Sequence, residues 1–108
     1  MPGTMLAAGI IACAASMTIG LCTVAGAGVV GQRLAGAADA AALAAADAAS
    51  GAVPGLPCER AQQVAASAGA VVEACELDGL IATVAVSTGY LGFTAGATAR
   101  AGPAPGSQ

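Results

Sequence analysis

The chain begins with an uncharged apolar stretch, Met5 to Val30, which continues without a helix breaker into an alanine-rich stretch, Gly31 to Ser50. A helix of roughly 20 apolar residues crosses a bilayer core, so about 26 residues are more than enough. Alanine has the highest helix propensity, and no proline interrupts either stretch. We therefore expect one continuous helix over residues 1–52, with a transmembrane segment at about 5–30 and the remainder outside the membrane.

The expected transmembrane segment is only weakly apolar, because alanine and glycine make up much of it. Its strongly apolar residues are Leu6, Ile10, Ile11, Ile19, Leu21, Val24, Val29 and Val30. At about −0.3 to −0.6 kcal/mol each, they supply about −2.5 to −5 kcal/mol towards insertion. Such a segment suits a subunit that is later withdrawn from the bilayer. Arg33 follows the segment and no basic residue precedes it, so charge alone favours the orientation opposite to the one we expect.

Small residues recur on one side of this segment. They are Ala8, Ala12, Ser16, Gly20 and, after Val24, Gly28. A stripe of this kind lets a second helix approach closely, so we interpret it as a helix-packing face. The alternative is that an alanine-rich chain scatters small residues without any such purpose.

Two processing signals offer other interpretations of the N-terminal segment. Ala25-Gly26-Ala27 fits a small-x-small signal-peptidase site, although the basic region that normally precedes it is missing. Ile10 to Cys13 resembles a lipoprotein cleavage box, again without a basic residue before it. We interpret Cys13 and Cys22 as small buried helix residues rather than as ligands or a lipid attachment site.

Composition argues against several classes of function. The 108 residues are 57% hydrophobic and 8% charged, with a net charge of −3 and no histidine. Nucleic-acid binding needs a basic face, and neutral-pH acid–base catalysis usually needs histidine. Asp39 and Asp47 lie about 12 Å apart along a helix, too far to share a proton or a metal ion. We expect no catalytic residue, cofactor, metal or small-molecule substrate.

Residues 53–101 are expected to form a small head. Pro57 suits the first turn of a short helix, and Gly69 suits its end. Val71–Leu77 and Leu80–Ser87 alternate in hydrophobicity around Asp78-Gly79, a preferred hairpin turn. In that register Leu77 lies opposite Leu80, and Cys75 lies opposite Ala82.

A loop, 89–92, should lead to a third strand over Phe93–Arg100, with Phe93, Ala95, Ala97 and Ala99 facing inward. The expected fold class is α+β: a long helix, a short helix and a three-stranded antiparallel sheet. Residues 102–108 should form a frayed tail.

Cys58 and Cys75 are the only cysteines outside the apolar stretch. A helix packed on the hairpin that follows it can bring them together, and a disulfide there would contribute roughly 3 kcal/mol in the chain-entropy model. The bond would also require an oxidising compartment. The alternative is two unrelated buried thiols.

Several of these features together resemble a known family. They are Gln32, the alanine-rich run from Ala38 to Ala46 with its Asp39, Pro57-Cys58, Ala61, Val64-Ala65, Gly69-Ala70, Cys75, Asp78-Gly79 and the closing Arg100 to Pro103. This pattern is similar to the TadE-like proteins of actinobacteria, which are encoded beside tight-adherence (Flp-type) pilus secretion genes. The resemblance covers residues 32–103 and is carried mainly by the alanine–aspartate helix and the cysteine spacing.

The resemblance implies a pilin-like fold and a minor pilin-like or pseudopilin-like subunit. Such a subunit is inserted in the cell membrane by a single pass with its head outside, and its partners are other pilin or pseudopilin subunits and the Tad assembly platform. Gly3-Thr4 stands where a prepilin peptidase would cut, but Ala8 occupies the position of the family's usual glutamate. Either the true start lies upstream, or this member is not processed. The competing hypothesis is a membrane-tethered or signal-peptide-cleaved secreted binding module of the envelope.

Overall fold

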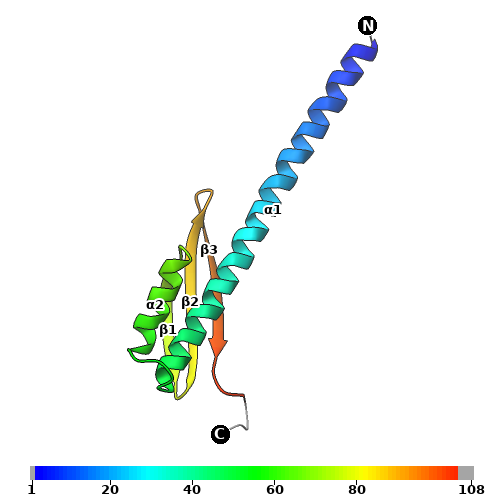
Figure 1. Ribbon diagram of the computed structural model, residues 1–108. Coiled ribbons are helices and arrows are strands. Elements are labelled where there is room, and N and C mark those ends of the chain that lie inside the picture. The colour runs from blue at the N-terminus through cyan, green and yellow to red at the C-terminus, as the bar shows by residue number, and fades with distance from the viewer. Residues whose placement is uncertain (1, 105–108) are drawn as a thin grey trace.

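The protein is an elongated molecule, 76 × 28 × 17 Å, in which one long helix extends well beyond a small head (Figure 1). The computed structural model describes the backbone of residues 2–104. It describes the side chains of the same residues except those at positions 2, 20, 22–25 and 27. The expected tail over 102–108 therefore lies partly outside the described residues.

Helix α1 (Pro2–Ala49) is continuous over 48 residues, as the alanine content and the absence of proline predict. At 1.5 Å per residue its length is about 72 Å, nearly the length of the molecule. Among the described residues, which leave out the side chains at 20, 22–25 and 27, no helix is long and apolar enough to cross a membrane. The transmembrane segment at about 5–30 includes those positions and stays a prediction.

Both helices end as the glycines predict. After α1, Gly51 adopts φ 81° and Ala52 N–H donates to the Asp47 carbonyl at 2.9 Å, the capping pattern of a helix that ends in glycine. Helix α2 (Pro57–Ser67) has proline in its first turn and ends before Gly69, which has φ 75°. Proline favours that first position because its missing N–H has no helical partner there.

Three strands follow in a meander: β1 (Val71–Asp78), β2 (Ile81–Tyr90) and β3 (Phe93–Ala101). All pairs are antiparallel and the sheet order is β1-β2-β3. The fold is thus α+β. Helix α2 packs against β1, while the C-terminal half of α1 lies beside α2 and packs against β2 and β3 (Figure 1).

The first hairpin turn was predicted one residue too early. Asp78 pairs with Ile81, so the turn is Gly79-Leu80, and Cys75 faces Val84 rather than Ala82. Gly79 alone has a positive φ, at 62°, which is the type II′ pattern. A turn at Asp78-Gly79 would have required positive φ at aspartate too. From Ala74 to Asp78 the pairing shifts by two residues, so residues predicted to share a face of the hairpin still do so. A bulge between Val72 and Ala74 changes the register at the start of β1.

The second hairpin is also tighter than predicted. Instead of a loop over 89–92, Tyr90 pairs with Phe93 around the two-residue turn Leu91-Gly92. Both turn residues have positive φ, 48° and 82°, as a type I′ turn requires. Sequence reasoning missed this turn because leucine is disfavoured at such a backbone angle.

Alanine makes up most of the core. Ten of the buried hydrophobic residues are alanines, joined by Leu34, Val84 and Val86. Six of these alanines lie on α1 between Ala37 and Ala46, and they face α2 and the sheet. The predicted inward residues of β3 are correct for Ala95, Ala97 and Ala99, which pack against this core. Phe93 was wrongly placed there, since it is 79% exposed.

The opposite side of α1 carries a polar stripe, made of Gln32, Gly36, Asp39, Asp47 and, just past the end of the helix, Ser50. Gln32, Gly36 and Asp39 are exposed, and so is Leu43, which interrupts the stripe. The head therefore uses one wide alanine face of α1 and leaves the polar face to solvent.

We expect Ala41→Leu to lower the free energy of unfolding by about 1–3 kcal/mol, because Ala41 is fully buried and a larger side chain must push α1 away from its neighbours. The matched control is Ala40→Leu, at an exposed position one residue away. Chemical denaturation of the full chain in detergent, followed by circular dichroism, measures both. Equal loss in the two variants would contradict this account of the core.

Candidate functional site

The N-terminal part of α1, residues 3–29, projects away from the head (Figure 1); we call it the arm. Its large hydrophobic side chains are 55–82% exposed: Met5, Leu6, Ile10, Ile11, Met17, Ile19, Leu21 and Val29. A soluble monomer rarely exposes so much contiguous apolar surface. The arm is therefore the prime candidate for an interaction surface.

The predicted helix-packing face lies on this arm. Ala8, Ala12, Ser16 and Gly28 are exposed, and the side-chain environment of Gly20 lies outside the described residues. A methyl group added at Gly28 would meet nothing within 4 Å. Gly28 lies sixteen residues and therefore about 160° around the helix from Ala12, so only Ala8, Ala12 and Ser16 of the predicted face share one side of the arm among the described positions. Gly3 and Thr4, the possible processing point, are exposed in the first turn of α1. The structure leaves processing there as a prediction.

Two hydroxyl groups on the arm are satisfied within the helix. Ser16 Oγ donates to the Ala12 carbonyl and Thr18 Oγ1 donates to the Ala14 carbonyl, each at 2.9 Å. An unsatisfied hydroxyl is costly in an apolar environment, and this bonding removes much of that cost. Cys13, expected to be a small buried residue, is an exposed free thiol. The side chain of Cys22 lies outside the described residues.

The tip of the β2–β3 hairpin reaches beside the base of the arm. The Tyr90 hydroxyl lies 2.5 Å from the place a Cβ on Gly26 would occupy, so glycine is needed for this close approach. Leu91 and Phe93 at the same tip are 67% and 79% exposed. Sequence reasoning did not single out this tip, although it holds the only tyrosine and phenylalanine of the chain.

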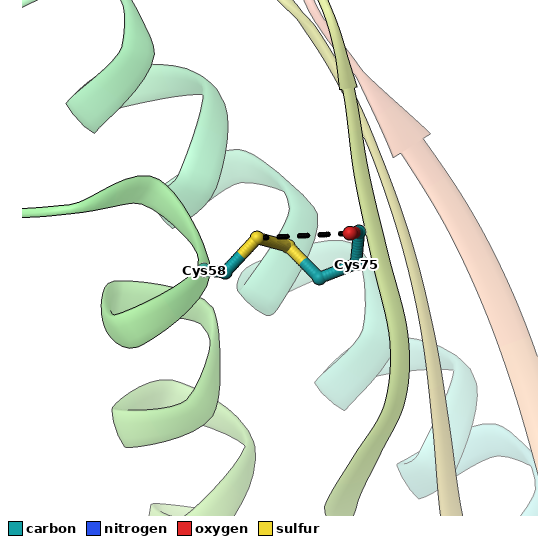
Figure 2. Close-up of a disulfide and its surroundings, with 2 residues drawn as sticks. All are labelled: Cys58 and Cys75. Atoms are coloured by element: carbon teal, nitrogen blue, oxygen red, sulfur yellow. Dashed lines mark hydrogen bonds between the residues drawn. A yellow bond between two sulfur atoms is a disulfide. The ribbon is translucent and has the colours of Figure 1, made fainter.

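Cys58 and Cys75 form the predicted disulfide, which joins the first turn of α2 to β1 (Figure 2). Their Cα atoms are 5.9 Å apart, within the usual range for a bridge. The dashed line in Figure 2 joins Cys58 Sγ to the Cys75 carbonyl oxygen at 3.7 Å. Since a bridged sulfur has no hydrogen to donate, we treat this as a packing contact.

Two grooves that are lined by residues of the head have few reactive side chains. One of about 370 Å³ lies at the far end from the arm, lined by Leu43, Ala46, Asp47, Ser50, Leu80, Gly102 and Pro103. Another of about 270 Å³ lies at the base of the arm and includes Arg33. Each has one charged side chain and no pair of groups suited to acid–base work. Among the described residues, no three side chains of the metal-ligating types come together.

Charge is confined to one end of the molecule. Every charged residue lies at position 33 or beyond, and none lies between Val86 and Ala99. The arm and the β2–β3 tip are therefore uncharged, while Arg33 and the rest of the head carry the net charge of −3.

No protein-family model matches the chain, and no curated protein or solved structure shows significant similarity to it.

We expect Cys58→Ser and Cys75→Ser each to lower the thermal stability of the head, by roughly 3 kcal/mol in the chain-entropy model. The double variant should lose no more than either single one, because both changes remove the same bond. Thermal unfolding of the three variants measures this. Free alkylation of both thiols in the native protein would refute the bond in solution.

Proposed function

We propose that this protein is a minor pilin-like or pseudopilin-like structural subunit of a Tad (Flp-type) pilus or a related secretion system. In this proposal the arm inserts in the cell membrane by a single pass, and the head lies outside. During assembly the arm packs against the helices of other subunits on the Tad assembly platform. The observation that carries the proposal is one continuous helix whose described large hydrophobic side chains are exposed in its first half and whose second half packs into a disulfide-bonded head.

The apolar surface of the arm supports a covered state. Its described leucine, isoleucine, methionine and valine side chains are 55–82% exposed, and their exposure to water is unfavourable by about 25 cal/mol per Å². Lipid or neighbouring helices would remove that cost. The uncharged sequence up to Gln32 is compatible with either environment.

The arm also suits a subunit that changes environment. Its strongly apolar residues favour insertion by only about −2.5 to −5 kcal/mol, a free energy that contacts with other subunits can match. Ser16 and Thr18 satisfy their hydroxyls within the helix, so neither lipid nor a helix bundle needs to supply them with partners.

The disulfide supports an extracytoplasmic head. Structural disulfides persist in oxidising compartments and are rare in the cytosol of most organisms. Cys58 and Cys75 are half-buried and bridge two elements of the head, which fits a structural rather than a catalytic bond.

One observation favours the alternative of a cleaved, secreted binding module. The buried hydrophobic core begins at Leu34, so removal of the chain up to Ala27 would leave the core residues in place. Such a product would lose Gly26 and with it the contact to Tyr90.

Mass measurement of the mature protein from membranes separates the two functions. We expect an N-terminus at or near the start of the chain, with the arm retained. A product that begins at Gly28 and is found in the medium would establish the secreted module instead.

Packing of arms through the small-residue face is tested by crosslinking. In a Cys22→Ser background, a short bismaleimide should join the Cys13 thiols of neighbouring subunits in membranes. We expect Ala12→Leu, on that face, to reduce the dimer band severalfold because it blocks close approach. The matched control is Ala14→Leu, which points to the other side of the helix because two residues turn it by about 200°. Equal effects of the two substitutions would count against this packing face.

A further inference from the structure

The β2–β3 tip gathers all the aromatic side chains of the protein. Tyr90 and Phe93 lie directly opposite each other on the two strands; the chain has no other tyrosine or phenylalanine and no tryptophan. With Leu91 in the turn between them, the tip presents three large side chains where hairpins usually present small polar ones.

The backbone conformation at position 91 is unfavourable for leucine. Its φ of 48° lies in the left-handed region, where glycine, asparagine or aspartate fits far better than leucine. The side chain is 67% exposed, so packing within the head does not offset the strain. A strained, exposed residue is a candidate for contact with something outside the chain.

The position of the tip indicates what Leu91 would contact outside the chain. Tyr90 reaches Gly26, four residues and therefore about 6 Å before Val30, where the apolar stretch ends. The tip thus overlaps the last turn of the expected transmembrane segment. Arg33, the first charged residue, lies about 10 Å from Gly26 along the helix towards the head.

We propose that the β2–β3 tip enters the lipid–water interface and sets the depth and tilt of the head on the membrane. This inference rests on the proposed insertion of the arm. Aromatic rings with a polar end concentrate at that level of a bilayer, and the tip and the arm carry no charge that would oppose entry. Leu91 and Phe93 then bury in lipid the surface that they expose in the isolated chain.

A second copy of the chain is the competing occupant, and the size of the tip argues against it. A stable protein interface buries about 800 Å² on each partner. Leu91 and Phe93, the two exposed large side chains at the tip, supply far less, whereas insertion at a bilayer surface requires only a few apolar groups.

The absence of tryptophan makes a sharp test possible. Three single-tryptophan variants of the full chain would be reconstituted in phosphatidylcholine–phosphatidylglycerol vesicles: Phe93→Trp at the tip, Ile11→Trp in the arm and Leu56→Trp before α2. All three replace side chains that are 60–80% exposed, at 79%, 68% and 62% respectively. Quenching by lipids brominated either near the headgroup or near the chain ends reports the depth of each tryptophan.

We expect headgroup-level bromine to quench Phe93→Trp at least about twofold more than Leu56→Trp, and deep bromine to quench Ile11→Trp. Quenching of Ile11→Trp without quenching of Phe93→Trp would overturn the tip proposal and leave insertion of the arm intact. An unquenched Ile11→Trp would overturn the insertion itself. Emission of Phe93→Trp that changes with protein concentration, and not with lipid, would assign the tip to a second copy and overturn the proposal.

Leu91→Asp provides a second test, because aspartate suits the turn angle while adding a charge. Introduced with Phe93→Trp, it should leave the thermal unfolding temperature unchanged or higher and reduce shallow quenching to the level of Leu56→Trp. The matched control is Thr94→Asp, an exposed position on the opposite face of β3. Undiminished quenching in the Leu91→Asp variant would contradict the proposal.

Discussion

Close packing of alanine on α1 is the constraint on which the rest of the structure depends. A face made of methyl groups can lie close against both α2 and the sheet, as the fully buried Ala38, Ala41 and Ala45 show. Such a face buries little apolar area per residue, so it contributes less to stability than a core of leucine and phenylalanine would. The disulfide between α2 and β1 compensates by restricting the unfolded chain.

The composition of α1 changes along its length. Beyond Leu34 its buried positions are nearly all alanine, and its polar stripe faces water. Before Arg33 the helix is uncharged and carries its larger hydrophobic side chains on the outside. A helix with apolar groups all around it is suited to lipid or to a bundle, and this contrast is why we propose a membrane-inserted structural subunit.

Much of this architecture follows from local signals in the sequence. Proline and glycine predicted where α2 begins and ends, and period-two alternation predicted the strands of the first hairpin. The cysteine pair was predicted because only Cys58 and Cys75 lie outside the apolar stretch. These features depend on nearby residues, which is why a single sequence is enough to find them.

The misjudged features depend on tertiary contacts or on unfavourable local geometry. The turn at Gly79-Leu80 displaced the more familiar Asp78-Gly79 turn by one position. The Leu91-Gly92 turn places a leucine at an angle that propensity argues against. Phe93 lies on the predicted face, yet the buried core does not extend that far along the hairpin. The contact of Tyr90 with Gly26 joins residues far apart in the chain, and no local sequence pattern predicts it.

The placement of the disulfide has a mechanical consequence. It closes a loop wholly inside the head, between residues separated by 17 positions, and leaves α1 without any covalent cross-link to the sheet. Tension applied to the N-terminus would therefore load the alanine contacts in shear along the helix axis. Under such a pull the bridge would keep α2 and β1 joined, and the first part to slide would be the long helix itself.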